Sequence, residues 1–435
     1  MSGESRPAAE IAADLFRREG ARLVATLTAH LGTHRLQLAE DVVQEALVRA
    51  LQTWPFRGIP ENPAAWLTLT AKNLALDLLR REQNWHRKET GISAEHERWL
   101  ASPALSNTEP DAFTDDTLRL MFVCFHPQLS VEVQTALALR TLCSLSPAEI
   151  ASAFLTTEAA IAKRLVRARQ KIRDLAIPFV IPDTRELPER LNGVLGTLYL
   201  LFNEGYKAST GDQLVRADLC HEAIRLASLL TENPATRTPA AHALLALMLF
   251  NAARLPARTD DAGNLLRLHE QNRGAWDRGM IASGIRQLGL AAVGDQLSAF
   301  HLEAGIAACH STAPDDVSTD WPRILSLYDQ LLAIKPSPIT ALNRAVAVAR
   351  VRGPGAGLAA LDEIHDRSTL GSYHLYHAIR GSLLAETGRM SDALVHFRQA
   401  GNLATLPAER DFIARRITEC GGPDPRRNDS TPGRH

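Results

Sequence analysis

Apolar side chains recur along this chain at the spacing of α-helices. Positions i, i+3 and i+4 are apolar from end to end, whereas the alternation typical of strands is scarce. Short breaks of Gly, Pro and Asn separate the segments. The pattern predicts an all-α protein, with domain boundaries at 102–111 and 177–188, where proline interrupts the helical spacing.

The segment Leu38–Leu51 predicts an amphipathic helix with one polar face. Asp41, Gln44 and Glu45 lie on that face, together with Arg49. The face is either a solvated helix surface or a docking surface for a basic partner helix, and composition does not choose between them. The predicted buried stripe comprises Leu38, Val42, Ala46, Leu47, Ala50 and Leu51.

A second helix is predicted from Pro63 to about Glu82, because Asn62 is a good N-cap and proline suits the first helical position. A loop bracketed by Trp54 and Trp66 precedes it. In this loop Phe56 and Arg57 could stack on or clamp an unpaired base, although core packing is the alternative for Trp66. The outer ridge of the helix carries Asn73, Asp77, Arg80 and Arg81, and its predicted buried stripe is Leu67, Ala71, Leu74 and Leu78.

A helix-turn-helix is predicted further along the chain. Ser146 and Glu149 form a capping box that opens a short helix, and Thr156 or Thr157 can cap a longer helix after a tight turn. The longer helix carries six basic residues against two acidic ones: Lys163, Arg164, Arg167, Arg169, Lys171 and Arg173 against Glu158 and Asp174. Its predicted buried stripe is Ile161, Leu165, Ala168 and Ile172.

A solvated cationic helix is the alternative interpretation of this basic helix, but the capped helix before it favours DNA binding. Residues near the helix start would meet base edges in the major groove, and later arginines, from Arg167 on, would neutralise phosphates. The predicted base-facing residues are Thr157, Glu158, Ala160, Lys163 and Arg164.

Composition adds little beyond this local patch. The 435 residues include 48 basic and 49 acidic ones, a net charge of −1, and 45% apolar residues, as in soluble globular proteins. The five scattered cysteines include no CxxC pair, which indicates a reducing compartment. The start of the chain lacks the apolar core of a signal peptide, and the longest apolar run, Ala243–Phe250, is short. We therefore expect a cytoplasmic protein.

No catalytic apparatus is visible in the sequence, which contains no P-loop, GxSxG, Rossmann glycine pattern or HExxH. We expect no enzyme activity and no cofactor. The pair Cys124 and His126 fits structural packing better than metal binding. Among His365, His374 and His377, the last two have a spacing that could hold a metal, but nothing nearby completes a ligand set.

Small residues in the C-terminal half recur at an interval of 34. Ala347 and Gly381 form one such pair, and Ala359 and Ala393 form another. This spacing predicts a tetratricopeptide-like solenoid, because small residues at these positions let paired helices approach closely. Such solenoids recognise peptides or proteins.

A segment before the repeats, LYLLFNEGY, places Tyr199, Phe202 and Tyr206 on one helical face, with Asn203 and Glu204 beside them. The face is either core packing or a contact that docks the repeats onto the domains before them. The tail from Gly421 has no apolar content to bury and is expected to be disordered.

Three motifs, in this order, resemble the extracytoplasmic-function (ECF) sigma factors of bacterial RNA polymerase. AEDVVQEALVRAL resembles the polymerase-docking helix of sigma region two, and NPAAWLTLTAKNLALDLLRRE resembles its promoter-melting helix. SPAEIASAFLTTEAAIAKRLVRARQKIR resembles the helix-turn-helix of region four. CFHPQLSVEVQTALALRTLCSLSPAEIASAFL and LYLLFNEGY further resemble the subgroup with a C-terminal tetratricopeptide-like extension, in which a cysteine usually stands in place of Phe125.

The resemblance implies a role for each segment. Asp41, Gln44 and Glu45 would face the coiled coil of the largest polymerase subunit. The minus-ten element, with a flipped base, would be bound by the Trp54–Trp66 loop together with Lys72, Asn73, Arg80 and Arg81. The region-four helix would read the minus-thirty-five element.

The implied organisation is region two at 8–85, a flexible link at 86–115, region four at 116–177, a junction at 178–210, a tetratricopeptide-like domain at 211–420 and a tail at 421–435. The implied partners are core RNA polymerase, through its beta and beta-prime subunits, and promoter DNA. A YCII-like protein is a candidate partner of the extension.

Two other interpretations of the sequence stay open. The chain could be a helix-turn-helix regulator that binds duplex DNA without polymerase and senses a partner through the repeats. It could also be a tetratricopeptide scaffold whose N-terminal helices merely resemble sigma helices, in which case the basic cluster 163–173 would be dispensable.

Overall fold

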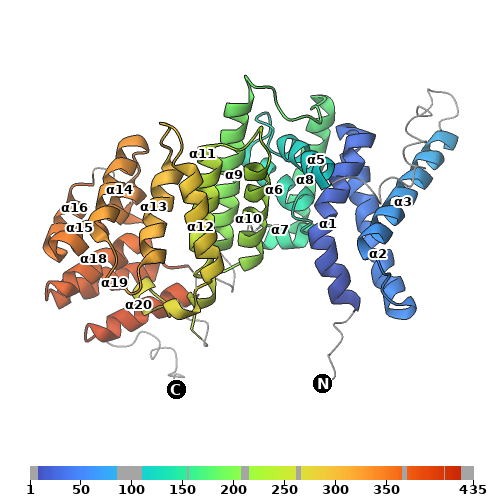
Figure 1. Ribbon diagram of the computed structural model, residues 1–435. Helices are drawn as coiled ribbons and strands as arrows, with labels where there is room; N and C mark the ends of the chain where they lie inside the picture. The colour runs from blue at the N-terminus through green and yellow to red at the C-terminus, as the bar shows by residue number, and fades with distance from the viewer. Residues whose placement is uncertain are drawn as a thin grey trace, which may run out of the picture. The chain divides into compact units, whose positions relative to one another are not determined.

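The computed structural model describes residues 8–85, 110–153, 156–206, 215–260, 266–364, 370–405 and 407–422. Every regular element within these ranges is a helix, which confirms the all-α prediction (Figure 1). The chain forms two compact units. The first comprises Met1–Leu200 with Glu232–Thr236, and the second comprises Leu201–Thr231 with Arg237–His435.

The first unit contains both the predicted docking helix and the predicted helix-turn-helix. Helix α1 packs against α2, α3 and α5, while α6 and α7 both pack against α8. The elements are α1 (Ala8–Leu31), η1 (Thr33–Arg35), α2 (Leu36–Arg57), α3 (Pro63–Trp85), α5 (Pro110–Cys124), α6 (Val131–Thr141), α7 (Pro147–Ala153), α8 (Glu158–Asp174) and the larger part of α9 (Leu187–Tyr206).

Helix α2 is longer than predicted, because it continues through Pro55 to Arg57. A proline this close to a helix end removes only one backbone hydrogen bond, so the last turn survives. The helix stops at Gly58, whose φ of +82° suits glycine and whose N–H donates to the Trp54 carbonyl oxygen. The predicted Trp54–Trp66 loop is therefore reduced to residues 58–62.

The buried face of α2 also differs from the predicted stripe. Leu51 is 37% exposed, whereas Val43 and Glu40 are buried. The spacing of Leu36, Val43 and Ala50 places Glu40 on the same face as these apolar residues. A carboxylate thus occupies a core position of this helix.

The predicted link at 86–115 lies mostly outside the described residues. Helix α5 begins at Pro110, so residues 110–115 belong to this helix and not to the link. The predicted tail also lies outside the described residues, except for Gly421 and Gly422.

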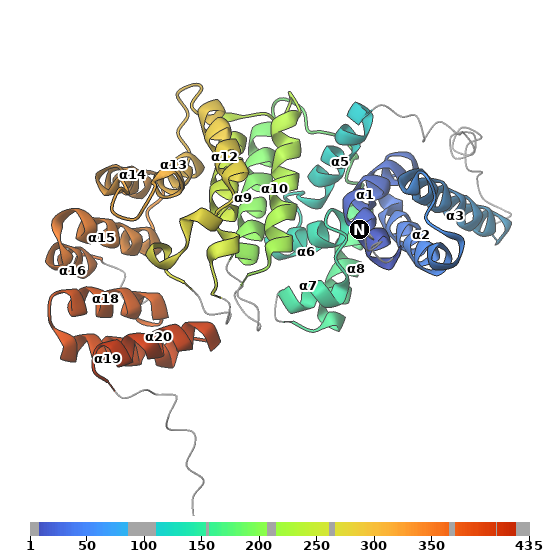
Figure 2. The ribbon, with the colours of Figure 1, turned by 60° about the horizontal axis from the view of Figure 1, so that its bottom comes forward.

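The second unit consists of successive helices, which Figure 2 shows from a second direction. Among the described residues between α11 and α12, three short 3-10 helices occur: η3 (Leu255–Ala257), η4 (Leu268–Glu270) and η5 (Arg273–Ala275). The α-helices after the end of α9 are α10 (Ala217–Glu232), α11 (Pro239–Ala252), α12 (Arg278–Ala291), α13 (Ala299–Thr312), α14 (Trp321–Ile334), α15 (Pro338–Arg352), α16 (Pro354–Asp362), α18 (His374–Glu386), α19 (Met390–Leu403) and α20 (Pro407–Glu419).

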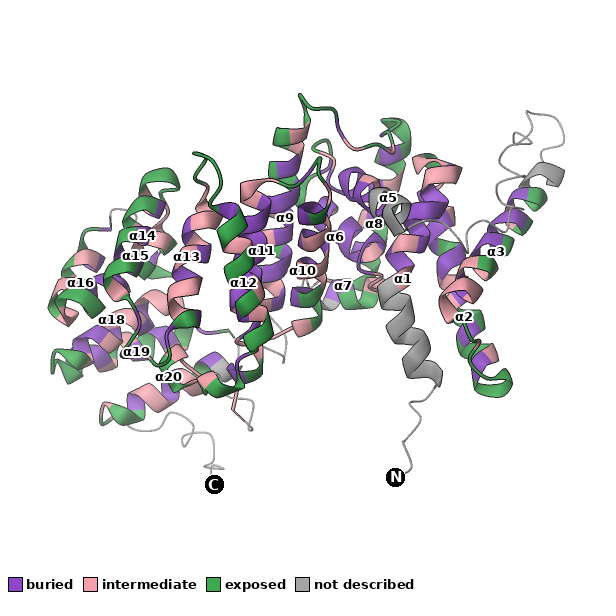
Figure 3. Ribbon diagram, in the orientation of Figure 1, coloured by how far each residue is buried: buried purple, intermediate pink, exposed green. Residues whose placement is uncertain are grey.

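Helix α11 is the core helix of this unit, because nearly all of its residues are buried (Figure 3). Pro239–Ala257 is long and apolar enough to cross a membrane, but 72% of that window is buried inside the protein. Burial against α12 and α13 accounts for its apolar composition.

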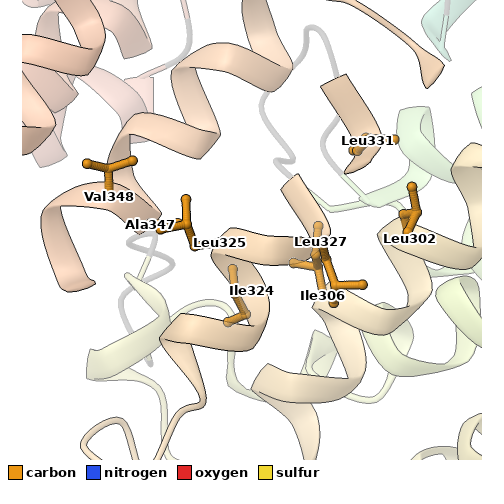
Figure 4. Close-up of a cluster of buried hydrophobic side chains, with 8 residues drawn as sticks. All are labelled: Leu302, Ile306, Ile324, Leu325, Leu327, Leu331, Ala347 and Val348. Carbon is orange, nitrogen blue, oxygen red and sulfur yellow. The ribbon is translucent and has the colours of Figure 1, made fainter. Parts of the chain in front are cut away.

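Neighbouring helices in the C-terminal half pack in chain order, α13 on α14, α14 on α15 and α15 on α16. Figure 4 shows the apolar cluster that joins three of them. Leu302 and Ile306 come from α13, and Ala347 and Val348 come from α15. Between them lie four residues of α14: Ile324, Leu325, Leu327 and Leu331.

Small residues mediate close helix contacts here, but not at every predicted position. A Cβ added to Gly381 would lie 3.0 Å from the Phe397 ring and 3.2 Å from the Ala393 carbonyl oxygen. In the preceding helix pair, α15 and α16, Gly357 approaches Ala349 closely. The prediction for Ala359 is wrong, because this residue is exposed.

We expect Gly357→Ala to lower the free energy of unfolding by about 1–3 kcal/mol, the usual cost of overpacking. Its new Cβ would lie 2.5 Å from the Ala349 Cβ and 3.1 Å from the Ala345 carbonyl oxygen. Gly289→Ala is the matched control, because this helical glycine has no neighbour within 4 Å. Urea denaturation followed by circular dichroism measures both, and an equal effect of the two substitutions would contradict the expectation.

We expect His310 to make the second unit less stable in mild acid. Burial, with Arg254 and Arg273 nearby, lowers the pKa of His310 to about 4. The unfolded chain takes up this proton below pH of about 6.5, whereas the folded protein resists it until pH of about 4, so stability falls as the pH drops through this window.

Between pH 7 and pH 5 the loss should be about 2 kcal/mol. Urea denaturation at both pH values measures it, with His310→Gln as the comparison. The variant should lose clearly less stability than the natural chain over this interval, and identical losses would rule out His310 as the source.

Candidate nucleic-acid and polymerase interface

The start of α3 is fixed by local hydrogen bonds. The Asn62 side-chain oxygen accepts from the Ala65 N–H at 3.0 Å, which confirms the predicted N-cap. Burial of Leu67, Ala71 and Leu74 turns Asn73, Arg80 and Arg81 to the exposed face of the helix. Two guanidinium groups and one amide thus lie on a single exposed helix surface.

Lys72 does not share that surface. Lys72 is only 3% exposed, and desolvation lowers the pKa of its ammonium group. Lys72 precedes Leu76 by four residues, which places both on one helix face, and Leu76 is buried. The expectation that Lys72 lies beside Asn73 at a DNA-facing surface is corrected accordingly.

Phe56 and Arg57 lie in the last turn of α2. Phe56 is 89% exposed, an unusual position for a large apolar ring. Trp66 is half-buried and contacts the buried Trp54 edge-on, with ring centroids 5.5 Å apart. Packing therefore holds Trp66 in place, while the Phe56 ring is accessible for stacking.

The polar face of α2 carries the three predicted docking residues. Asp41 and Glu45 are exposed, and Gln44 is partly buried. Glu45 accepts from Arg49 Nε at 3.1 Å within the same helix. Desolvation raises the pKa of the Asp41 carboxyl, and the nearby cations Arg169 and Arg140 oppose this shift.

Capping hydrogen bonds define both helices of the predicted helix-turn-helix. The Ser146 N–H donates to the Glu149 carboxylate at 2.7 Å, and the Glu149 N–H donates to Ser146 Oγ at 3.2 Å. Thr157 Oγ1 accepts from the Ala160 N–H at 3.2 Å. The predicted capping box and N-cap are confirmed. The predicted apolar stripe of α8 is also confirmed, because all four of its residues are buried.

The remaining faces of α8 present polar and cationic groups. Thr157, Glu158, Lys163 and Arg167 are exposed, and Ala160 and Arg164 are partly buried. Arg164 Nη2 lies 3.4 Å from a carboxylate oxygen of Glu132 on α6. Arg167 extends the exposed basic surface along the helix.

Arg169 has a different environment from the other arginines of α8. Its Nε and Nη2 both donate to Glu40 Oε2, at 2.9 and 2.5 Å, and Thr141 Oγ1 donates to Glu40 Oε1 at 2.5 Å. The side chains of Arg169 and Glu40 are 10% and 3% exposed. The prediction that Arg169 faces phosphate is therefore not met in this arrangement.

Glu40 was not singled out from the sequence, although a signal for it exists. Glu40 lies four positions after Leu36 and three before Val43. At this spacing a charged residue interrupts the apolar face of an amphipathic helix. Such a position indicates a buried partner of opposite charge.

Packing within the second unit holds two aromatic residues of the LYLLFNEGY segment. Phe202 is buried and stacks on Tyr206, with ring centroids 5.8 Å apart. Arg254 donates to the Tyr206 hydroxyl at 2.7 Å, and Arg258 donates to the Tyr206 carbonyl oxygen at 2.7 Å. Asn203 is exposed, while Tyr199 and Glu204 are partly buried.

Across the described residues, no three His, Cys, Asp or Glu side chains are placed to hold a metal ion. His374 pairs with Glu409 at 3.1 Å, and His377 contacts His396 at 3.2 Å. His365 lies outside the described residues. Cys124 is fully buried, and burial raises the pKa of its thiol well above the usual range.

A capped helix-turn-helix whose second helix exposes basic side chains is an arrangement typical of DNA-binding proteins. Comparison with known families agrees with this class. Residues 15–85 match sigma-70 region 2, residues 119–172 match sigma-70 region 4, and residues 190–292 match a family of unknown function, DUF6596.

Uncharacterized protein R00370 of Rhizobium meliloti (strain 1021) is 40% identical over 387 residues, which cover 87% of this chain and 89% of that protein. No solved structure matches the chain. The chain belongs to the same family as the Rhizobium protein, and its two sigma-70 regions make it an ECF-type sigma factor that directs RNA polymerase core to promoter DNA.

Proposed function

We propose that this protein is an alternative sigma factor of the ECF subgroup with a C-terminal tetratricopeptide-like extension, and that it acts in the cytoplasm without enzyme activity of its own. The capped cationic helix α8 is the observation that carries the proposal, in a chain that also matches sigma-70 region 2. Region two would bind polymerase and the minus-ten element, and region four would read the minus-thirty-five element.

The docking step would use the polar face of α2. Asp41 and Glu45 are exposed carboxylates, and Gln44 lies between them on the same helix. Acidic and amide groups at this spacing complement a basic helical partner, the expected coiled coil of beta-prime. Contacts of this kind mainly set the association rate and the orientation of the complex.

Capture of the minus-ten element would use the end of α2 and the ridge of α3. The accessible Phe56 ring can stack on an unpaired base, which is worth about 1–3 kcal/mol per base. Arg57 lies beside it, and Trp66 supports this end of the helices from its packed position. Asn73, Arg80 and Arg81 would bind the backbone and base edges, and the buried Lys72 takes no part in this surface.

Recognition of the minus-thirty-five element would use the first half of α8. Thr157, Glu158, Ala160, Lys163 and Arg164 lie in its first two turns, where a recognition helix meets base edges. A bidentate contact from arginine to guanine discriminates by about 1–3 kcal/mol. Arg167 would neutralise a phosphate and contribute to salt-dependent affinity.

The extension would recognise a protein partner and regulate or support initiation. Stacked helix pairs, such as α15 with α16 and α18 with α19, present extended surfaces suited to peptide or protein ligands. A YCII-like protein is the candidate partner that the family resemblance suggests. The chain passes from the first unit to the second within α9, the helix that carries Tyr199, Phe202, Asn203, Glu204 and Tyr206.

We expect Arg164→Ala combined with Arg167→Ala to abolish promoter-specific run-off transcription while core polymerase binding survives. Both residues lie on α8, whereas the predicted docking residues lie on α2. The double substitution Arg185→Ala with Arg286→Ala is the matched control, since both arginines are exposed and lie outside α2, α3 and α8. Loss of polymerase binding instead of promoter recognition would overturn the helix assignments, and tight duplex binding without polymerase would favour an ordinary helix-turn-helix regulator.

We expect a chain that ends at Leu200 to differ from the full chain in transcription, because the extension regulates or supports initiation. The cut follows α9 residues that belong to the first unit: Arg190 donates to the Phe122 carbonyl oxygen, and Thr197 donates to the Gln134 side chain. A cut at Pro188 would remove both. Run-off transcription on a promoter library measures the effect, and equal transcript levels from both folded chains would make the extension accessory.

A further inference from the structure

Glu40 connects the two sigma regions across the first unit. Its carboxylate belongs to α2 of region two and accepts from Arg169 on α8 and Thr141 on α6, both of region four. Arg140 is a further cation near Glu40. The side chains that donate hydrogen bonds to the Glu40 carboxylate, Arg169 and Thr141, thus both belong to region four.

Other contacts join the same two regions. Thr33 Oγ1, just before α2, donates to the Ile177 carbonyl oxygen at 2.7 Å, just after α8. Helix α1 packs against α5, and η1 packs against α8. Regions two and four thus form one closed unit in the free chain.

This closed unit is too small to span a bipartite promoter. The minus-ten and minus-thirty-five elements are about 25 base pairs apart, which is about 85 Å at 3.4 Å per base pair. A compact unit of about 200 residues has a radius of gyration of about 16 Å, hence a diameter of about 45 Å. Binding both elements at once requires the two regions to separate.

Separation must break the contact between Glu40 and Arg169. A buried carboxylate and a buried guanidinium stabilise each other only while they are paired, and removal of one partner leaves an uncompensated charge. After opening, both groups regain water. The same opening removes Arg169 and Arg140 from the neighbourhood of Asp41, on the predicted docking face.

We propose that Glu40 and Arg169 form an autoinhibitory latch, which holds the free sigma factor closed and opens when polymerase and promoter DNA are bound. The proposal rests on the proposed function for the role of opening, but the closed state itself is measurable in the free protein. The latch would lower the apparent affinity for polymerase, because only the open fraction of molecules can bind productively.

The test measures the distance between spin labels on the full chain. Gln52→Cys on α2 and Asp174→Cys on α8 are exposed labelling positions, with Cys309→Ser and Cys420→Ser to remove the partly exposed native thiols. The free protein should give one short distance, and the complex with core polymerase and promoter DNA should give a longer one. A short distance that persists in the complex would overturn the proposal.

The Arg169→Ala variant should show the long distance without polymerase and bind core polymerase about tenfold more tightly. Glu40→Gln should change the distance and the affinity in the same direction, to a smaller extent. Because it retains the side-chain volume, it is the second variant if Arg169→Ala fails to fold. Arg119→Ala is the control, because it removes an ion pair to Asp116 within α5. Folded Arg169→Ala and Glu40→Gln proteins with the natural distance would contradict the latch.

These outcomes separate the latch from the proposed function. If the natural chain never binds core polymerase, the proposed function fails. The distance in the free Arg169→Ala and Glu40→Gln proteins still decides whether the ion pair holds the two regions together.

Discussion

The burial of one carboxylate constrains the arrangement of the first unit. Glu40 is almost inaccessible to water, and its carboxylate accepts hydrogen bonds from two N–H groups of Arg169 and from the hydroxyl of Thr141. A charge in this position is costly unless all of these donors are in place. Helices α2, α6 and α8 must therefore meet at one point, and this meeting brings the two sigma regions together.

Helix α8 combines two kinds of arginine two positions apart. Arg167 is exposed, whereas Arg169 is paired inside the unit. Because consecutive helical residues are rotated by about 100°, positions two apart lie on nearly opposite faces. One helix can thus carry a DNA-binding surface and a contact between the regions, so that recognition and closure share a single rigid element.

Apolar packing forms the core of the second unit. A nearly all-buried helix, α11, forms its core, and close contacts at Gly357 and Gly381 bring later helices together. At its beginning, Arg258 lies over the Tyr206 ring with its guanidinium carbon 3.8 Å from the ring centroid. Burial lowers the pKa of Arg258, and the aromatic ring and the Tyr206 carbonyl oxygen replace part of its lost hydration.

The sequence by itself determined the helical class, the start of α3 at Asn62, the capping box at Ser146 and the cap at Thr157, because these depend on neighbours within four residues. Tertiary structure decided the burial of Lys72, the contacts of Gly357 and the pairing of Glu40 with Arg169, 129 residues apart. Periodicity shows which face of a helix is apolar. Which distant side chain meets a charge on that face is fixed only when the helices pack.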